Sequence, residues 1–183
     1  MVNNDPNIQK RSGYSQYDIL QKVLFQPNMN SRYIFNFQFS NSSNVPRYDR
    51  LAEMDGSKLK YADWYYGPQR RLFSSLRAEY NNNSALYDKA YLTAAYQNIS
   101  EIRVNRKFNN ANESHQEETV DVLSFNADLM KSLTQKNELR YGIEVCYNNV
   151  GSEAYAINVN TNVKSYNIAS RYPDNGSKYI TLA

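Results

Sequence analysis

The chain has 183 residues, 41% of them apolar, and a net charge of +3, which suits one ordinary domain and excludes a strongly charged disordered tail. Its mean hydropathy is −0.77, and no apolar run approaches the roughly 18 residues of a transmembrane helix, although a transmembrane β-strand stays possible because its alternating side chains average to polar. Basic and acidic residues are interspersed, which argues against a nucleic-acid partner.

Six segments alternate between apolar and polar residues, which predicts β-strands because a strand projects successive side chains to opposite faces. In chain order they are 15–26, 33–40, 71–80, 86–107, 121–130 and 139–148. The alternation is weakest in the first segment and clearest in the second, where four aromatic residues share one face. In the fourth segment, the apolar residues stay on even-numbered positions for about twenty residues. Typical strands run only about 3–10 residues. That length favours a tall barrel wall that continues beyond a membrane.

The connections between these segments alternate in length. The short ones are 27–32, 81–85 and 132–137, and the long ones are 41–63, 109–118 and the stretch from 149 onward. Aromatic residues lie near the strand ends, and such rings favour the boundary between membrane and water. Short turns on one side and long loops on the other are typical of outer-membrane barrels. We therefore predict an all-β fold, an antiparallel up-and-down transmembrane β-barrel segment.

Two other β architectures fit the same pattern. A soluble β-sandwich also has one apolar face on each strand, so a soluble all-β binding module, such as an adhesin or a carbohydrate-binding domain, is one alternative. A complete small outer-membrane barrel is the other, because about 22 residues per strand and connection place about eight strands in 183 residues.

Charges on the second face of the strands favour a piece of a larger barrel. The charged residues predicted to face inward are Arg71, Arg77, Glu101, Arg103, Arg140 and Glu144. A small barrel can bury such charges only in pairs, whereas a wide, watery lumen accommodates them. The first ten residues do not resemble a signal peptide, and a new alternating stretch begins at 179. We expect residues 1–183 to be a fragment of a β-barrel domain, with about six to seven strands of the whole.

Seven stretches, in order along the chain, carry a family resemblance. They are SGYSQYDILQKVLFQP (12–27), NVPRYDRL (44–51), KLKYADWYYGPQRRLFSSL (58–76), YDKAYLTAAYQNISEIRVNRKF (87–108), ESHQEETVDVLSFNADLMK (113–131), NELRYGIEVCYNNVGSEAY (137–155) and SRYPDNGSKY (170–179). These stretches resemble the β-barrel of TonB-dependent outer-membrane receptors. The resemblance covers most of the chain and implies the central part of a barrel of roughly twenty-two strands in a Gram-negative outer membrane.

The same resemblance implies a function and partners. Receptors of this family take up scarce nutrients, such as siderophore-bound iron, haem or cobalamin, and TonB drives transport by pulling on a plug domain. We therefore expect the chain to supply barrel wall, in contact with outer-membrane lipid, and extracellular loops that face a small nutrient ligand. The plug domain, the TonB-binding segment and the closing strands are expected in parts of the parent chain outside residues 1–183.

Two clusters in the outer loops are candidates for ligand contact. They are Arg47, Tyr48, Asp49 and Arg50, and then Trp64 and Tyr65. Arginine offers planar bidentate donors for carboxylates or phosphates, and aromatic rings offer stacking faces. The first cluster also fits a structural role, in which an Arg–Asp pair braces the long loop against the barrel. The second also fits an aromatic girdle followed by lumen charges.

The sequence carries no catalytic signature, since GxSxG, GxxxxGK[ST], HExxH and CxxC do not occur in it. We therefore expect no enzyme activity, no cofactor and no metal site. The single histidine, His115, falls in a predicted polar loop with Glu117 and Glu118, and we expect all three side chains to be solvated. Cys146 falls on an inward-facing position and is interpreted as a small residue rather than a reactive thiol.

Overall fold

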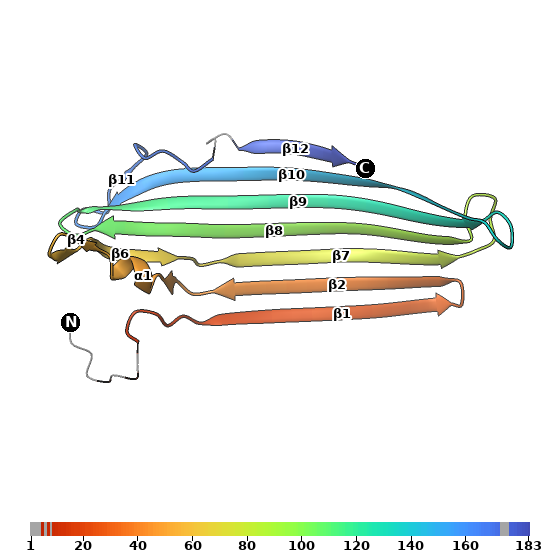
Figure 1. Ribbon diagram of the computed structural model, residues 1–183, viewed down its shortest axis with the longest axis horizontal. Coiled ribbons are helices and arrows are strands. Elements are labelled where there is room, and N and C mark those ends of the chain that lie inside the picture. The colour runs from red at the N-terminus through yellow and green to blue at the C-terminus, as the bar shows by residue number, and fades with distance from the viewer. Residues whose placement is uncertain (1–4, 6, 8, 173–175) are drawn as a thin grey trace.

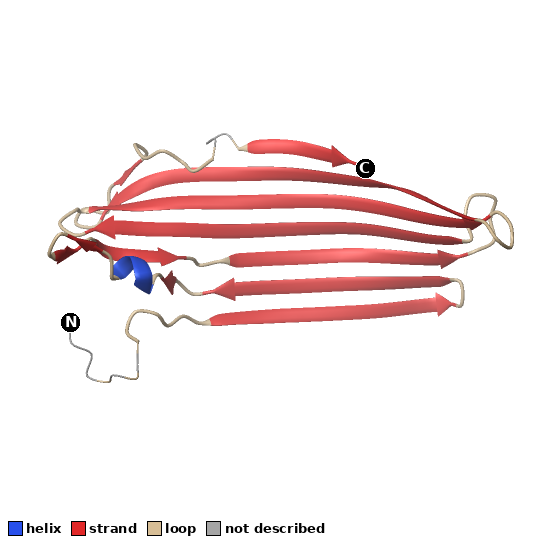
Figure 2. Cartoon of the chain, viewed as in Figure 1, coloured by secondary structure: helices blue, strands red, loops and turns tan. Residues whose placement is uncertain are grey.

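The computed structural model describes residues 5, 7, 9–172 and 176–183, and its main feature is one large antiparallel sheet (Figure 1, Figure 2). The strands of this sheet are β1 (Gln16–Asn28), β2 (Ser31–Ser42), β3 (Val45–Pro46), β6 (Tyr61–Tyr66), β7 (Arg70–Asn81), β8 (Lys89–Lys107), β9 (Asn112–Ser132), β10 (Glu138–Asn158), β11 (Lys164–Ser165) and β12 (Ser177–Leu182). The helix α1 (Tyr48–Leu51) and a small hairpin, β4 (Met54–Asp55) with β5 (Lys58–Leu59), lie between β3 and β6. The prediction of an all-β fold is confirmed.

Seven strand positions lie side by side in the order β1, β2, β7, β8, β9, β10 and β12 (Figure 1). Three short strands prolong these positions without widening the sheet: β3 continues β2, β6 continues β7 along β8, and β11 pairs with β10 beyond β12. All these pairings are antiparallel. Within the described residues, β1 and β12 each have a partner on one side only. The predicted antiparallel sheet is therefore confirmed, and it is open rather than closed into a barrel.

The register separates two kinds of side chain onto opposite faces of the sheet. One transverse row across the seven positions consists of Val23, Phe35, Leu76, Ala94, Phe125, Val145 and Leu182. The next row, on the opposite face, consists of Lys22, Asn36, Ser75, Ala95, Ser124, Cys146 and Thr181. We name these the apolar face and the polar face. The charged residues that were predicted to share one face all lie on the polar face.

Large side chains of the apolar face are open to solvent in the isolated chain. Leu123 is 58% exposed, Phe125 43% and Ile143 51%. This apolar band runs from Leu72 to Tyr80 on β7, and a strand that crosses a bilayer at a tilt needs about 9–11 residues. A contiguous exposed apolar surface of this kind marks an interaction surface.

Aromatic rings border the apolar band at both ends. At the end with the short turns, the Tyr33 ring lies 6.3 Å from that of Phe25 and 6.0 Å from that of Tyr80. The hydroxyl groups of Tyr33 and Tyr80 are 3.3 Å apart. At the other end, the ring centroids of Tyr17 and Phe39 are 6.0 Å apart. Such rings place an apolar body beside the band and a polar tip toward water.

The predicted bounds of two loops are wrong, because β9 and β10 are longer than the alternation indicates. β9 begins at Asn112, within the predicted loop 109–118, and β10 continues beyond 149 to Asn158. The two strands stay paired over this whole length, so the backbone hydrogen bonds of the ladder hold polar residues in place. His115 is consequently in a strand rather than a solvated loop, and its ring stacks on that of Tyr155 at 4.9 Å.

Candidate functional site

The first predicted cluster lies in the connection that holds α1, at the end of the sheet away from the short turns (Figure 2). The Arg47 guanidinium donates two hydrogen bonds to the Asp49 carboxylate, from Nε at 2.8 Å and from Nη2 at 2.6 Å. The Arg47 backbone N–H donates to the Trp64 carbonyl at 3.0 Å, and Nη1 donates to the Tyr66 hydroxyl at 3.2 Å. The bonds to Trp64 and Tyr66 fasten the start of α1 to β6.

Two arginines share the rings of Trp64 and Tyr66. The Arg47 guanidinium lies 5.2 and 5.4 Å from the two ring centroids, and that of Arg103 lies 5.9 and 5.5 Å from them. Trp64 is only 8% exposed, so these cation–π contacts are partly desolvated and correspondingly stronger. Arg47 therefore pairs with Asp49 inside the connection and contacts the rings of Trp64 and Tyr66 on β6.

The remaining predicted residues do not join this cluster. Tyr48 is exposed, and Arg50 forms an ion pair with Glu53 at 3.2 Å. Tyr65 lies on the face opposite its neighbour Trp64, because successive residues of a strand alternate. Burial raises the pKa of the Tyr65 hydroxyl to about 12. The structure therefore does not gather the predicted residues into a single site.

Arg47→Ala should loosen the α1 connection from β6, because it removes the hydrogen bond to the Tyr66 hydroxyl and the contacts with the Trp64 and Tyr66 rings. In the folded protein, tryptic cleavage after Lys58 should become about tenfold faster, because the connection opens more often once these contacts are lost. Arg50→Ala is the matched control, since it removes only a surface ion pair. Similar cleavage rates in the two variants would argue against the bracing role.

The Arg47–Asp49 pair should also show a characteristic pH dependence. Hydrogen bonds from Arg47 lower the pKa of the Asp49 carboxyl from 3.8 to about 2. Because the folded pKa is depressed, the pair stabilises the connection above pH 3.8 and is lost as the pH falls toward 2. The carbon-13 shift of the Asp49 carboxyl should therefore titrate near pH 2, and near 3.8 in Arg47→Ala. The same midpoint in both proteins would refute this assignment.

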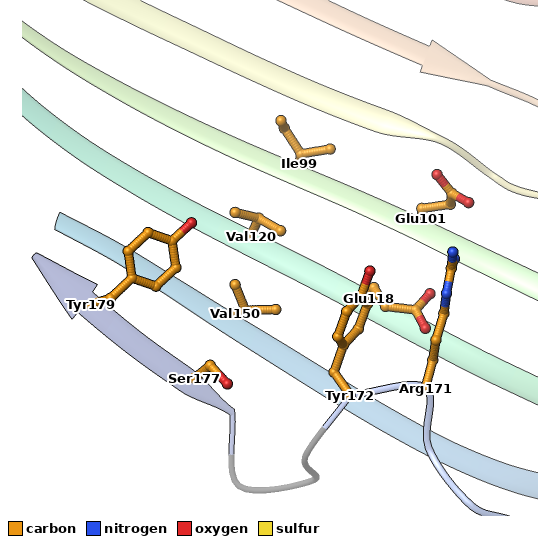
Figure 3. Close-up of a pocket in the computed structure, with 9 residues that line it drawn as sticks. All are labelled: Ile99, Glu101, Glu118, Val120, Val150, Arg171, Tyr172, Ser177 and Tyr179. Carbon is orange, nitrogen blue, oxygen red and sulfur yellow. The ribbon is translucent and has the colours of Figure 1, made fainter. Parts of the chain in front are cut away.

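A second candidate site, which sequence reasoning missed, is a hollow of about 490 Å³ on the polar face (Figure 3). Its lining residues are Ile99, Glu101, Glu118, Val120, Val150, Arg171, Tyr172, Ser177 and Tyr179. β8, β9 and β10 form its floor, and Arg171, Tyr172 and the β12 residues Ser177 and Tyr179 line one side of it (Figure 3). A concave, largely apolar site with a few charged groups suits a small molecule.

The register explains how three successive strands build the floor of this hollow. Ile99, Val120 and Val150 are direct neighbours across β8, β9 and β10 and form the apolar floor. In the next row of the same face, Glu101 of β8 stands directly opposite Glu118 of β9. Burial raises the pKa of the Glu118 carboxyl, and the positive charges of Arg171 and Arg103 act in the opposite direction. Glu118 is therefore not the solvated loop residue that the sequence indicated.

No family model matches the chain. No curated protein matches its sequence either. The arrangement of the side chains is consequently the basis for any statement about function.

The described residues also bear on metal binding and membrane crossing. Among them, no group of three or more His, Cys, Asp or Glu side chains is placed to hold a metal ion. In that same part of the chain, no helix combines the length and apolar character needed to cross a membrane.

Cys146 lies on the polar face, as predicted, and accepts a hydrogen bond from the Asn148 amide at 3.4 Å.

A further cluster on the apolar-face side of the wall, beyond the band, has a structural role. The Lys164 ammonium lies 3.5 Å from the Tyr155 ring centroid and 4.7 Å from that of Tyr166. It also pairs with Glu153 at 3.1 Å. These contacts hold the short strand β11 against β10.

Proposed function

We propose that the chain forms part of the barrel wall of a TonB-dependent receptor, which takes up a scarce nutrient across a Gram-negative outer membrane. The observation that carries this proposal is the two-faced sheet, with a band of exposed apolar side chains bordered by aromatic rings. Lipid chains would cover the band, and removing apolar surface from water contributes about 25 cal/mol per Å². The polar face would then line a watery lumen.

The direction of the strands favours a wall segment over a complete barrel. Seven antiparallel positions are an odd number, so β1 and β12 run in the same direction (Figure 1). Joining these two edges would create a parallel pair, whereas bacterial outer-membrane barrels are antiparallel throughout and have even strand numbers. Head-to-tail pairing of identical copies would create the same parallel pair. On this proposal, an odd number of further strands completes the barrel.

The two ends of the sheet suit different sides of the membrane. β1 and β2 join through the tight turn Met29–Asn30, at the end where the other connections are also short. At the opposite end, β8, β9 and β10 continue past the apolar band. The α1 connection and β11 also lie at this end, where β6 pairs with β8 and β11 pairs with β10. Short periplasmic turns and taller extracellular walls are typical of outer-membrane barrels. In this orientation the hollow on the polar face lies on the extracellular side of the lumen.

A soluble binding module accounts for the sheet less well. It would leave the apolar band and two unpaired strand edges in water, which promotes aggregation. Covering the band with lipid and the edges with further strands removes both problems. The proposed location therefore explains the exposed apolar side chains and the open edges together.

The proposal is tested by expressing the gene with its native flanking sequence in two Gram-negative hosts, one with TonB and one without. The protein should fractionate with the outer membrane in both hosts. Uptake of its nutrient, screened with radiolabelled ferric siderophores, haem and cobalamin, should occur only in the host with TonB. Recovery of the protein in the soluble fraction, or equal uptake in both hosts, would contradict the proposal.

A further inference from the structure

The apolar band does not end at the same transverse row on every strand. At the end away from the short turns, one row of the apolar face begins on β1, β2 and β7 with Ile19, Phe39 and Leu72. The same row continues on β8, β9, β10 and β12 with Asn98, Asp121, Asn149 and Lys178. On these four strands the band therefore ends one row, or two residues, nearer the short turns than on β2 and β7.

The polar residues of this row form a hydrogen-bonded group at the edge of the band. The Asp121 carboxylate accepts hydrogen bonds from the Asn98 amide at 2.8 Å and from the Tyr96 hydroxyl at 2.7 Å. Arg70, one row farther from the short turns, donates to the Asn98 side-chain oxygen at 3.4 Å. Charged and amide groups of this kind are costly in hydrocarbon, so a lipid boundary on β8 and β9 lies below them, at the Tyr96 ring.

The opposite edge of the band is displaced in the same direction. On β2 the last residue of the band is Tyr33, and Ser31 occupies the next row of that face. The row of Ser31 continues across the sheet to Leu129 of β9 and Tyr141 of β10, which still belong to the band. β10 adds Leu139 one row farther on. From β2 to β10 this edge therefore shifts by four residues toward the short turns.

The two shifts give the inclination and the thickness of the band. Two to four residues correspond to about 7–13 Å along a strand, and the four strand spacings from β2 to β10 span about 19 Å. The band is therefore inclined by about 20–35° to the transverse rows. On β7 and β10, where it is longest, it runs about 27 Å along the strand, which gives a thickness of about 22–26 Å perpendicular to its edges.

We propose that the apolar face fits a thin bilayer, with a hydrocarbon core of about 22–26 Å, which crosses the sheet obliquely so that the strands tilt by about 20–35° from the membrane normal. The aromatic rings at both ends of the band then lie at the two boundaries of the hydrocarbon. The inference rests on the proposed function, because lipid is the partner that covers the band. It adds the thickness of that partner and a depth for each strand.

Spin labels within one transverse row test the inclination. Phe39→Cys and Asn149→Cys, which share a row, are made singly in a Cys146→Ser background. The protein is expressed from the gene with its native flanking sequence and reconstituted in bilayers, and label depth is measured from collision rates with oxygen and with a nickel complex. The label at 39 should lie about 7–11 Å deeper in the bilayer than the label at 149. Equal depths would overturn the proposal.

A second pair at the other edge of the band provides the matched control. Ser31→Cys and Leu129→Cys also share a row. Here the label on β9 should be the deeper one and the label on β2 the shallower one, the reverse of the order at the first edge. The same strand giving the deeper label at both edges would mean that the sheet sits higher or lower in the bilayer without the proposed inclination.

The length of the lipid chains tests the thickness. The protein is reconstituted in a series of phosphatidylcholine bilayers that differ only in chain length, and the urea midpoint of unfolding is compared. The midpoint should be highest where the hydrocarbon core is about 22–26 Å and should fall in bilayers of about 30 Å or more, because a mismatch between band and core is unfavourable. A midpoint that is highest in the thicker bilayers, or equal in all of them, would overturn the proposed fit.

The outcomes separate this inference from the proposed function. Labels that are all buried in lipid or at its surface, with equal depths along each row, would leave the barrel wall intact and remove the oblique geometry. Labels at 39 and 129 that both remain in water would remove the barrel wall and the oblique geometry together.

Discussion

Phe125→Arg should prevent most of the protein from assembling in the outer membrane, whereas Ser124→Arg should assemble nearly normally. Phe125 belongs to the central row of the apolar band, and Ser124 lies beside it on the polar face. An arginine on the lipid face at the bilayer midplane costs about 2–4 kcal/mol, while lumen positions tolerate charge. The yield of Phe125→Arg should therefore fall by about 30-fold or more.

This pair of variants is read out as the amount of protein in the outer-membrane fraction, normalised to total synthesis. The two substitutions add the same side chain at adjacent positions of β9, so differences in propensity and expression largely cancel. Equal yields would mean that the apolar face does not contact lipid. A lower yield for Ser124→Arg would mean that the two faces are exchanged.

Gly142→Ala should disrupt the pairing of β9 and β10 with a comparably large effect. A Cβ atom at position 142 would lie 2.3 Å from the Ala127 carbonyl oxygen, which is a backbone atom and cannot move aside easily. Forcing extra atoms into such a contact costs about 1–3 kcal/mol. The midpoint of urea unfolding in detergent micelles should fall accordingly.

Gly151→Ala provides the matched control on the same strand. Its Cβ atom would lie 3.9 Å from the Thr119 carbonyl oxygen, an ordinary van der Waals distance. This variant should unfold at the same urea concentration as the parent protein or slightly higher, because alanine restricts the unfolded chain more than glycine. Equal destabilisation by the two substitutions would show that the close contact at position 142 is not what limits stability.

The faces of the strands could be predicted from sequence because their period is two residues. Alternation in segment 33–40 and in its neighbours places apolar residues on one side whatever the final pairing. The structure confirms this for positions as far apart as Arg71 and Glu144, which were predicted to share a face and do so. One local pattern thus determined the orientation of most side chains in the sheet.

The ends of β9 and β10 could not be predicted in this way. Residues 112–118 are almost entirely polar, so they show no apolar alternation. Their strand conformation comes from pairing with β8 and β10 and from contacts such as the stacking of His115 on Tyr155. The partners on β10 are distant in sequence, and a single strand segment contains no sign of them.

The two candidate sites differ in how far apart in sequence their residues lie. The pairing of Arg47 with Asp49 was among the predicted interpretations because the two residues are near neighbours in sequence. The hollow depends on Arg171 and Tyr172 lying over β8 and β9, more than fifty residues earlier in the chain. Glu118 gave no signal in the sequence beyond its charge.

The most direct test of the account is a spin-label scan along β9 in reconstituted bilayers. Single cysteines are introduced from 122 to 130 in a Cys146→Ser background and labelled with a nitroxide, and their collision rates with oxygen and with a water-soluble nickel complex are compared. We predict a period of two residues, with labels at 123, 125, 127 and 129 accessible to oxygen in the lipid and the intervening labels accessible to nickel. Labels at 123 and 125 that are reached by nickel rather than oxygen would contradict the claim that the apolar face contacts lipid.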